Sequence, residues 1–176
     1  MMRRALPIAA ALLAGLLGFW LTLNWTPGFI MSRAMEKMES SGAVTNAAMH
    51  APPITEASRN VVRPSPDILY SICPFDLSQG PLLIQARWPR SGSYASISVY
   101  DSRTNNIFTL NDRDLGRAPA IWLDRPDAEA APDGTITAES PTEAGLVLYR
   151  RIVEDPSMLP RADAERRSFR CDAQTR

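Results

Sequence analysis

The segment Tyr94–Tyr100, which reads YASISVY, decides the fold class of this chain. Every second residue is apolar: Ala95, Ile97 and Val99 share one face, while serines and tyrosines occupy the other. A period of two residues places alternate side chains on opposite faces of a strand. The segment therefore predicts a half-buried β-strand, with one face against a core.

Short apolar runs bounded by turn residues recur on both sides of this strand. The predicted strands are Ile68–Cys73, Pro81–Arg87, Tyr94–Tyr100, Ile107–Leu110, Ala120–Leu123, Thr135–Ala138 and Gly145–Val153. No helical pattern of crossover length lies between them, which argues against a doubly wound parallel sheet. The pattern predicts a mainly β fold, either an antiparallel β-sandwich or a small barrel.

The last residues of the chain have a helical pattern. Asp155 can cap a helix, Pro156 suits the first helical position, and Pro160 can begin the run RADAERRSF. Arg161 and Glu165 are four residues apart and can pair on an exposed helix face. We therefore expect a short C-terminal helix and tail over residues 155–176, after a β-rich domain over residues 59–154.

The first residues resemble a membrane anchor. Arg3 and Arg4 precede roughly 20 apolar residues without a charge, about the length that crosses a ~30 Å hydrocarbon core. The alternative is a cleaved signal peptide, which has a shorter apolar region and ends in a small-residue cleavage site. The run here ends in Asn24-Trp25-Thr26-Pro27. We therefore predict an uncleaved signal-anchor helix over residues 1–26.

The orientation of the anchor depends on its flanks. Arg3 and Arg4 on one side balance Arg33 and Lys37 on the other, so the basic residues alone do not decide it. The short basic N-terminal tail resembles the start of a signal sequence, which stays inside. We expect a single-pass membrane protein with its C-terminal domain outside the cytoplasm.

Residues 27–58 are expected to form a juxtamembrane helix and a linker. Phe29–Ser41 has a methionine stripe at roughly helical spacing. This stripe rests on the membrane surface, rests on the domain, or belongs to a helix that continues the anchor past Pro27. The following stretch, Gly42–Ser58, is small and polar with a Pro52-Pro53 pair, which indicates a linker.

The composition excludes several kinds of function. The chain has 19 basic and 19 acidic residues, and no basic cluster dense enough to neutralise nucleic-acid phosphates. It lacks a nucleophile elbow, a phosphate-binding glycine loop and a C-x-x-C pair. One histidine, His50, cannot build a usual zinc site without several carboxylates or thiolates nearby. We expect no metal, no cofactor and no nucleic-acid partner.

The chain has two cysteines, Cys73 and Cys171. In an oxidising compartment they would close a disulfide loop of roughly 100 residues, which stabilises by up to ~4.7 kcal/mol in the chain-entropy model. The alternative is two unpaired thiols, with Cys73 as a small core residue. A pair of Cys73 with His50 as nucleophile and base is disfavoured, because His50 falls in the expected linker.

Carboxylates at strand ends are the remaining candidates for chemistry. Asp67, Asp76, Asp101, Asp112 and Asp114 stand next to turn residues, where aspartate usually bonds nearby backbone. Asp67 and Asp76 bracket a run that holds Tyr70, and these three residues form the candidate pocket, able to do acid/base work. The alternative is that the aspartates form turns and Tyr70 belongs to the core.

Three segments that include these residues resemble a known family. NVVRPSPDILYS (60–71), FDLSQGP (75–81) and YASISVYDSRTNNIFTLNDRD (94–114) resemble, in order, the DUF1254 family and its small membrane-anchored members. Larger relatives have Asn-x-Asp-Thr-x-Tyr where this chain has Ser65, Asp67, Ile68 and Tyr70, and they carry a second domain, DUF1214. The resemblance implies a β-rich fold in the bacterial envelope and gives no reaction. Together with the anchor, it implies a single-pass protein of a bacterial inner membrane with its C-terminal domain in the periplasm.

Three functions follow as expectations. The first is a periplasmic β-rich domain that binds a partner protein, with a separately encoded DUF1214-type chain as the candidate. The second is an envelope hydrolase or isomerase that uses Asp67, Asp76 and Tyr70 in a pocket. The third is a purely structural envelope module. An enzyme is the less favoured interpretation, because no recognisable set of catalytic groups is present.

Overall fold

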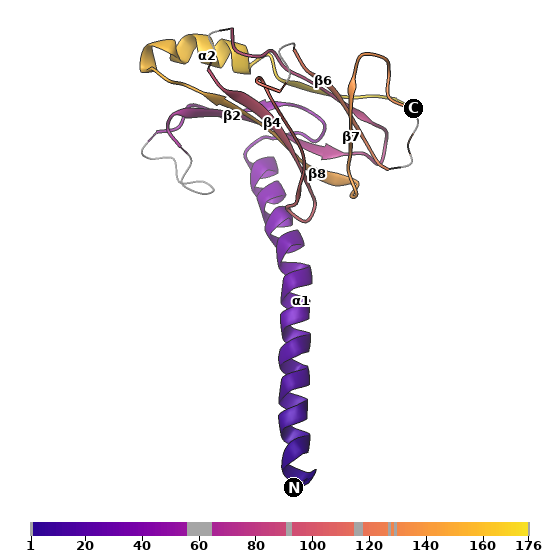
Figure 1. Cartoon of the computed structure of the whole chain (residues 1–176). Helices are drawn as coiled ribbons and strands as arrows, with labels where there is room; N and C mark the ends of the chain where they lie inside the picture. The colour runs from indigo at the N-terminus through magenta and orange to yellow at the C-terminus, as the bar shows by residue number, and fades with distance from the viewer. Residues whose placement is uncertain are drawn as a thin grey trace.

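A long N-terminal helix, α1 (Met2–Ser40), projects from a β-rich domain (Figure 1). The computed structural model describes residues 2–55, 65–90, 93–114, 118–126, 128 and 130–175. α1 passes Pro7 and Pro27 without a break. Of the alternatives for the methionine-rich segment, the structure shows that it continues the N-terminal helix.

α1 is long and apolar enough to cross a membrane. Its most apolar 18-residue window has a mean hydropathy of 1.7, and none of that window is buried in the protein. Large side chains such as Leu12, Leu16 and Phe19 are about two-thirds exposed. A helix with apolar side chains on all sides is typical of a membrane span.

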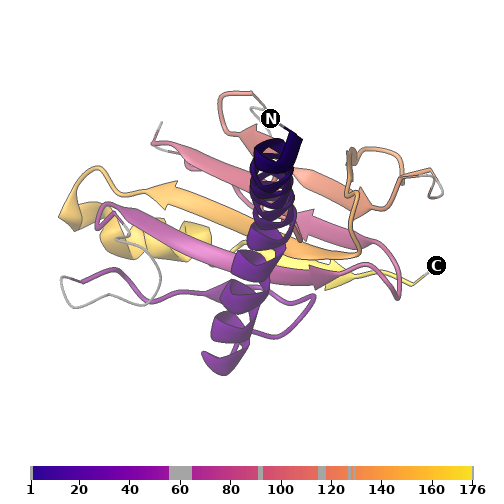
Figure 2. The ribbon, with the colours of Figure 1, turned by 90° about the horizontal axis from the view of Figure 1, so that it is seen from below.

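The C-terminal part of α1 lies beneath the β-rich domain, as Figures 1 and 2 both show. Met31 is buried there, and Ala34, Met35 and Met38 are half-buried at helical spacing. Farther along the helix toward its N-terminus, Asn24 accepts a hydrogen bond of 3.4 Å from the Arg103 guanidinium. The methionine stripe is therefore a packing surface against the domain.

The domain consists of two β-sheets. The first sheet has the order β1-β2-β8-β4-β5, and all its neighbours are antiparallel. Its strands are β1 (Met49–His50), β2 (Ile68–Asp76), β4 (Ala95–Asp101), β5 (Asn106–Asn111) and β8 (Ala144–Ile152). The second sheet has the order β7-β6-β3-β9, with strands β3 (Leu82–Gln85), β6 (Ala120–Asp124), β7 (Ile136–Glu139) and β9 (Arg170–Ala173).

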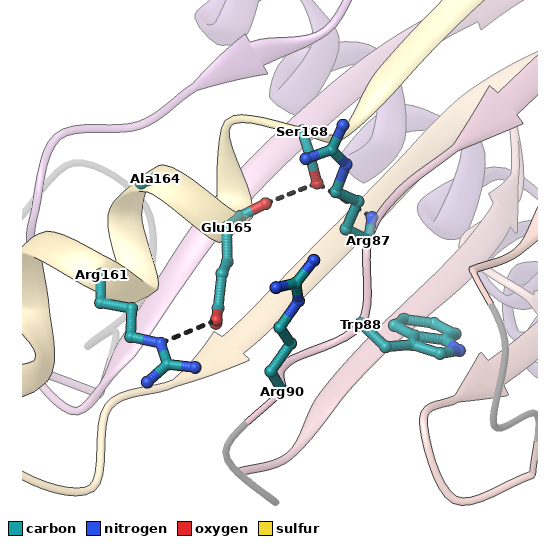
Figure 3. Close-up of a pocket in the computed structure, with 7 residues that line it drawn as sticks. All are labelled: Arg87, Trp88, Arg90, Arg161, Ala164, Glu165 and Ser168. Carbon is teal, nitrogen blue, oxygen red and sulfur yellow. Dashed lines mark hydrogen bonds and ion pairs between the residues drawn. The ribbon is translucent and has the colours of Figure 1, made fainter.

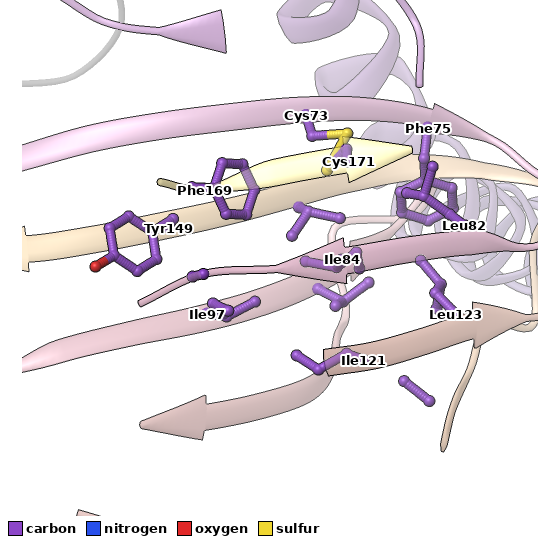
Figure 4. Packing of buried hydrophobic residues seen from close by; sticks show 14 of the residues in the cluster. Cys73, Phe75, Leu82, Ile84, Ile97, Ile121, Leu123, Tyr149, Phe169 and Cys171 are labelled. Carbon is purple, nitrogen blue, oxygen red and sulfur yellow. A yellow bond between two sulfur atoms is a disulfide. The ribbon is translucent and has the colours of Figure 1, made fainter. Parts of the chain in front are cut away.

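The core lies between the two sheets (Figure 4). Phe75, Ile97 and Tyr149 enter it from the first sheet, and Leu82 and Ile121 enter it from the second. All five are at most 1% exposed. Burial of such side chains stabilises by about 1.5–3 kcal/mol each, which makes this layer the main source of stability. The fold is a mainly β sandwich, as the sequence predicts, and not a barrel.

All seven predicted strands are present, with three differences in detail. β2 continues beyond Cys73 to Asp76 through Pro74. β4 is buried on both faces and not half-buried, because side chains of the flanking strands cover Ser98: Arg150 and Thr109 both bond its hydroxyl. β6 and β7 are parallel, whereas the sequence predicts antiparallel pairs.

Two further strands are present that the sequence does not predict. β1 lies inside the segment 42–58, which is expected to be a linker, and it pairs with β2 through Met49–Ile72 and His50–Ser71. β9 pairs with β3 after the C-terminal helix. Both are short strands, and their partners are distant in sequence, so neither has a local signal of its own.

The C-terminal segment begins as predicted. Asp155 caps a 3₁₀ turn, η1 (Pro156–Met158), by accepting a hydrogen bond from the Ser157 amide. The helix α2 (Leu159–Arg166) follows and ends before Phe169, and the Ser168 hydroxyl donates a hydrogen bond to the carbonyl of Glu165.

A disulfide between Cys73 of β2 and Cys171 of β9 joins the two sheets across the core (Figure 4). The Cα atoms are 6.5 Å apart, within the range that a disulfide spans. Both cysteines are buried. Of the two alternatives that the sequence leaves open, the structure shows the disulfide and not two unpaired thiols.

Candidate functional site

The structure does not bring Asp67 and Asp76 together. They stand at opposite ends of β2, nine residues apart, which corresponds to about 30 Å along an extended strand. Asp76 accepts a hydrogen bond of 2.8 Å from the Ser78 amide and so forms a turn. Asp67 is exposed, and its carbonyl accepts a hydrogen bond from the Val153 amide. One pocket cannot hold both carboxylates.

Tyr70 lies on the face of β2 that points away from the core. Its neighbours in β2, Leu69 and Ser71, are buried on the core side, whereas Tyr70 is half-buried. Tyr70 stands opposite Arg150 of β8, and Arg150 stands opposite Ser96 of β4, so these three residues form one row across the sheet. In this row the Arg150 Nε and the Ser96 hydroxyl are buried without a hydrogen-bond partner among the described residues.

Of the other strand-end aspartates, Asp101 forms a turn as the sequence predicts, whereas Asp112 bonds a neighbouring strand and Asp114 bonds a side chain. Asp101 accepts hydrogen bonds from the amides of Arg103 and Asn105, and Asp112 accepts one from the Ala95 amide. Asp114 bonds the side chain of Asn111. Among the described residues, no group of three or more His, Cys, Asp or Glu side chains is placed to hold a metal ion.

The candidate functional site is instead a groove between α2 and the segment that follows β3 (Figure 3). Its volume is about 350 Å³, and it is open to solvent. Three arginines, one tryptophan and one carboxylate dominate its walls, and we call it the arginine groove. The lining residues are Arg87, Trp88, Arg90, Arg161, Ala164, Glu165 and Ser168.

Hydrogen bonds hold both walls of the arginine groove. The Ser168 hydroxyl accepts a bond of 2.9 Å from the Arg87 amide and donates one of 2.6 Å to the Glu165 carbonyl. The Tyr149 hydroxyl donates to the Arg87 carbonyl at 3.3 Å. Burial raises the pKa of Tyr149 well above its ordinary value, so this hydroxyl remains a donor beyond the pH at which an exposed tyrosine ionises. The segment after β3 is therefore fixed to both α2 and β8.

Glu165 connects the groove to the interior. One carboxylate oxygen accepts bonds of 3.2 and 2.8 Å from the buried Arg151, and the other accepts one of 3.2 Å from Arg161. Burial acts most strongly on Glu165 and would raise its pKa. The hydrogen bonds and charges of Arg151 and Arg161 together outweigh burial, and the pKa of Glu165 is lowered. Glu165 is therefore ionised, and it joins α2 to Arg151 of β8 instead of acting as a proton donor.

The sequence predicts one contact of this site and misses the rest. The Arg161–Glu165 pair is predicted from its spacing and is confirmed. Arg87 and Arg90 are missed, because the run Arg87-Trp88-Pro89-Arg90 follows a strand and has no motif. The only hint in the sequence is that two arginines flank a tryptophan at the end of a predicted strand. The groove itself forms only where α2 lies beside this segment.

One protein-family model matches the whole β-rich domain. The family model of DUF1254, a protein family of unknown function, matches residues 45–173. The chain belongs to the DUF1254 family. The match is longer than the resemblance in the sequence suggests, because it includes β1 at one end and β9 at the other. The DUF1254 domain of this chain is therefore the complete sandwich with α2.

Two solved structures have a similar fold. One is the crystal structure of the VPA0106 protein from Vibrio parahaemolyticus, with a TM-score of 0.65 and 9% identity over 84% of this chain. The other is an uncharacterised protein from Burkholderia cenocepacia, with a TM-score of 0.51 and 15% identity over 87% of this chain. At such identities the likeness concerns the fold alone. This chain covers 35% and 42% of those two chains, less than half of each.

A comparison with curated proteins found no significant match.

Proposed function

We propose that this protein is a single-pass bacterial inner-membrane protein whose DUF1254 domain binds a partner protein in the periplasm. The partner is a separately encoded chain of the DUF1214 type. One observation carries the proposal: the fold of this chain corresponds to less than half of two longer solved chains. A domain that occurs within longer chains often keeps surfaces that a neighbouring domain covers, and a second polypeptide can cover them instead.

The membrane part of the proposal is supported by α1. Its N-terminal half is apolar and exposed, and its C-terminal half packs on the domain through Met31. A helix that is continuous from the apolar segment into the domain suits an uncleaved anchor better than a removable signal peptide. Trp20 and Trp25 are exposed near the middle of α1, where indole side chains suit the membrane interface.

The periplasmic location is supported by the disulfide. Bonds of this kind form and persist in oxidising compartments and are rare in the cytoplasm. The buried Cys73–Cys171 bond lies within the domain that would be exported. Fusion of alkaline phosphatase after Arg176 tests the orientation: we expect an active fusion, and an inactive fusion that is stably inserted in the membrane would contradict a periplasmic domain.

The partner is tested by affinity capture. The full chain with a C-terminal tag is cross-linked in cells, solubilised in mild detergent and captured, and the co-purifying chains are identified by mass spectrometry. We expect a DUF1214-type chain that is absent from captures of an unrelated single-pass protein. Reproducible absence of such a chain would refute the partner and favour a purely structural module.

A further inference from the structure

We propose that the arginine groove is a binding site for a small organic anion that carries carboxylate or phosphate groups. Arg87, Arg90 and Arg161 supply the charge, and Trp88 supplies an apolar wall. Figure 3 shows Arg90 reaching up between Glu165 and Trp88, with Arg161 on the opposite side of Glu165. The groove is a site of its own, and anion binding there does not depend on the proposed protein partner.

The charge of the groove is only partly neutralised from within. Glu165 is the one carboxylate among the lining residues; it pairs with both Arg161 and the buried Arg151, so it offsets at most one of the three lining arginines. Among the described residues, neither Arg87 nor Arg90 takes part in a salt bridge. The formal charge of the whole chain is +0, so the groove is a local concentration of positive charge on a neutral protein. Such a concave positive site raises the local concentration of anions.

The geometry suits recognition by guanidinium groups. Arginine presents a planar fork of donors that matches carboxylate and phosphate oxygens, and such bonds are about twice as strong as neutral ones. The hydrogen bonds of Ser168 and Glu165 hold the walls in place before a ligand arrives. The walls are therefore ordered before binding, and the ordering that remains is that of the exposed Arg87 and Arg90 side chains.

The size and position of the groove restrict the ligand. A volume of about 350 Å³ lies at the lower end of small-molecule sites, so a compact ligand with a short carbon skeleton fits best. Trp88 offers an apolar surface for that skeleton. α2 lies on the side of the domain away from the N-terminus of α1 (Figure 1). The head groups of a bilayer crossed by α1 are thus out of reach, and the ligand comes from solution.

Calorimetric titration of the detergent-solubilised full chain tests the site. The probes are succinate and glycerol 3-phosphate, with glycerol as the uncharged control and hexaglutamate as an acidic peptide for comparison, at one ionic strength set by chloride. We expect saturable binding of at least one anion and none of glycerol. Absence of binding for both anions, or equal binding of glycerol, would overturn the proposal. So would binding of hexaglutamate alone, which would indicate an acidic polypeptide as the ligand.

Variants place the binding in the groove. Arg90→Gln removes one guanidinium and should weaken binding about tenfold, the effect of losing one charge-assisted hydrogen bond. Ala164→Leu fills the groove from the exposed side of α2 without a change of charge, and it should weaken binding as much or more. Arg125→Gln is the matched control, because Arg125 pairs with Glu143 on the surface outside the groove.

The pattern across the three variants decides the outcome. Loss of affinity in Arg90→Gln and Ala164→Leu, with less than about a twofold change in Arg125→Gln, supports the site. An equal loss in Arg125→Gln would show that the anions respond only to the total charge. Unchanged affinity in Ala164→Leu would place the ligand elsewhere on the protein. Melting temperatures within a degree or so of the parent chain verify that each variant is folded.

Discussion

Gly145 is the residue at which the core of the sandwich has no room for a side chain. It lies in β8 between Phe75 of β2 and Asp101 of β4. A Cβ atom built on it would overlap the Tyr100 carbonyl oxygen and come within 2.5 Å of the Phe75 Cζ. The Phe75 ring thus occupies the space that a side chain at position 145 would need. Backbone oxygen atoms in a paired strand cannot move away without loss of the ladder.

We expect Gly145→Ala to destabilise the domain by about 1–3 kcal/mol, as overpacking of a core usually does. For a chain of this length that corresponds to a fall of roughly 2–4 °C in melting temperature per kcal/mol. Circular dichroism of the detergent-solubilised chain measures it. Gly18→Ala is the matched control, since a Cβ at Gly18 meets nothing within 4 Å. Equal melting temperatures for both variants would contradict the packing argument.

The helix α2 is held to the first sheet by buried arginines. The Arg166 guanidinium donates to the carbonyls of Ala51 and Tyr70 at 2.6 Å each and pairs with Asp163. Arg151 of β8 pairs with Glu165 in the same way. A buried guanidinium must satisfy its donors, so removal of either carboxylate would leave an uncompensated charge. The attachment of α2 therefore depends on the ionised state of its acids.

Acidification should weaken this attachment in two stages. Burial lowers the pKa of His50 below 6.5, with Arg166 and Arg167 acting in the same direction and Asp163 against it. In the unfolded chain His50 binds a proton near pH 6.5, whereas in the folded chain it binds one only at lower pH. The unfolded state therefore binds more protons in this pH range, and the free energy of unfolding falls as the pH drops through it. The pKa of Asp163 is also lowered: burial would raise it, but the hydrogen bonds of Arg167 and Arg166 outweigh burial. Its contribution is lost at lower pH still.

The first stage can be isolated by mutation. Urea unfolding between about pH 7.5 and pH 5.5 covers the range in which an ordinary histidine titrates and carboxylates do not. We expect the parent chain to lose stability over this range and His50→Gln to lose less, because His50 is the sole histidine. Gln retains a polar group that can meet the Ser71 hydroxyl, which His50 contacts at 2.8 Å. An unchanged pH slope in His50→Gln would refute this role.

The elements differ in how far the sequence predicts them. The seven strands with a run of apolar residues or an apolar/polar alternation are predicted, because burial of a strand leaves such a pattern in its own sequence. The extension of β2 through Pro74 is not predicted, because proline has no N–H to donate to a strand partner. The Pro74 carbonyl accepts a hydrogen bond from the Asn46 amide and not from β8. The nitrogen of Pro74 therefore also faces the sheet edge, where no strand partner needs a donor. The arginine groove is also missed, since its two walls, the segment after β3 and α2, are far apart in the sequence.

The Cys73–Cys171 bond ties the two sheets of the sandwich together. It joins β2 to β9 across the core and spans 98 residues, so it encloses most of the DUF1254 domain. A cross-link of this length removes much of the freedom of the unfolded chain and stabilises by up to ~4.7 kcal/mol. It also fixes the segment after α2, and with it one wall of the arginine groove.

We expect Cys73→Ser/Cys171→Ser to lower the melting temperature by several degrees, because the unfolded chain gains freedom while the core loses little volume. The parent chain with dithiothreitol should melt like the double variant. Non-reducing gel electrophoresis of chain alkylated in intact cells measures the bond itself: the parent should migrate faster than its reduced form, and both single variants should migrate like reduced chain. Two titratable thiols in the unreduced parent, with unchanged migration, would show that the bond does not form in the cell and would also weaken the periplasmic assignment.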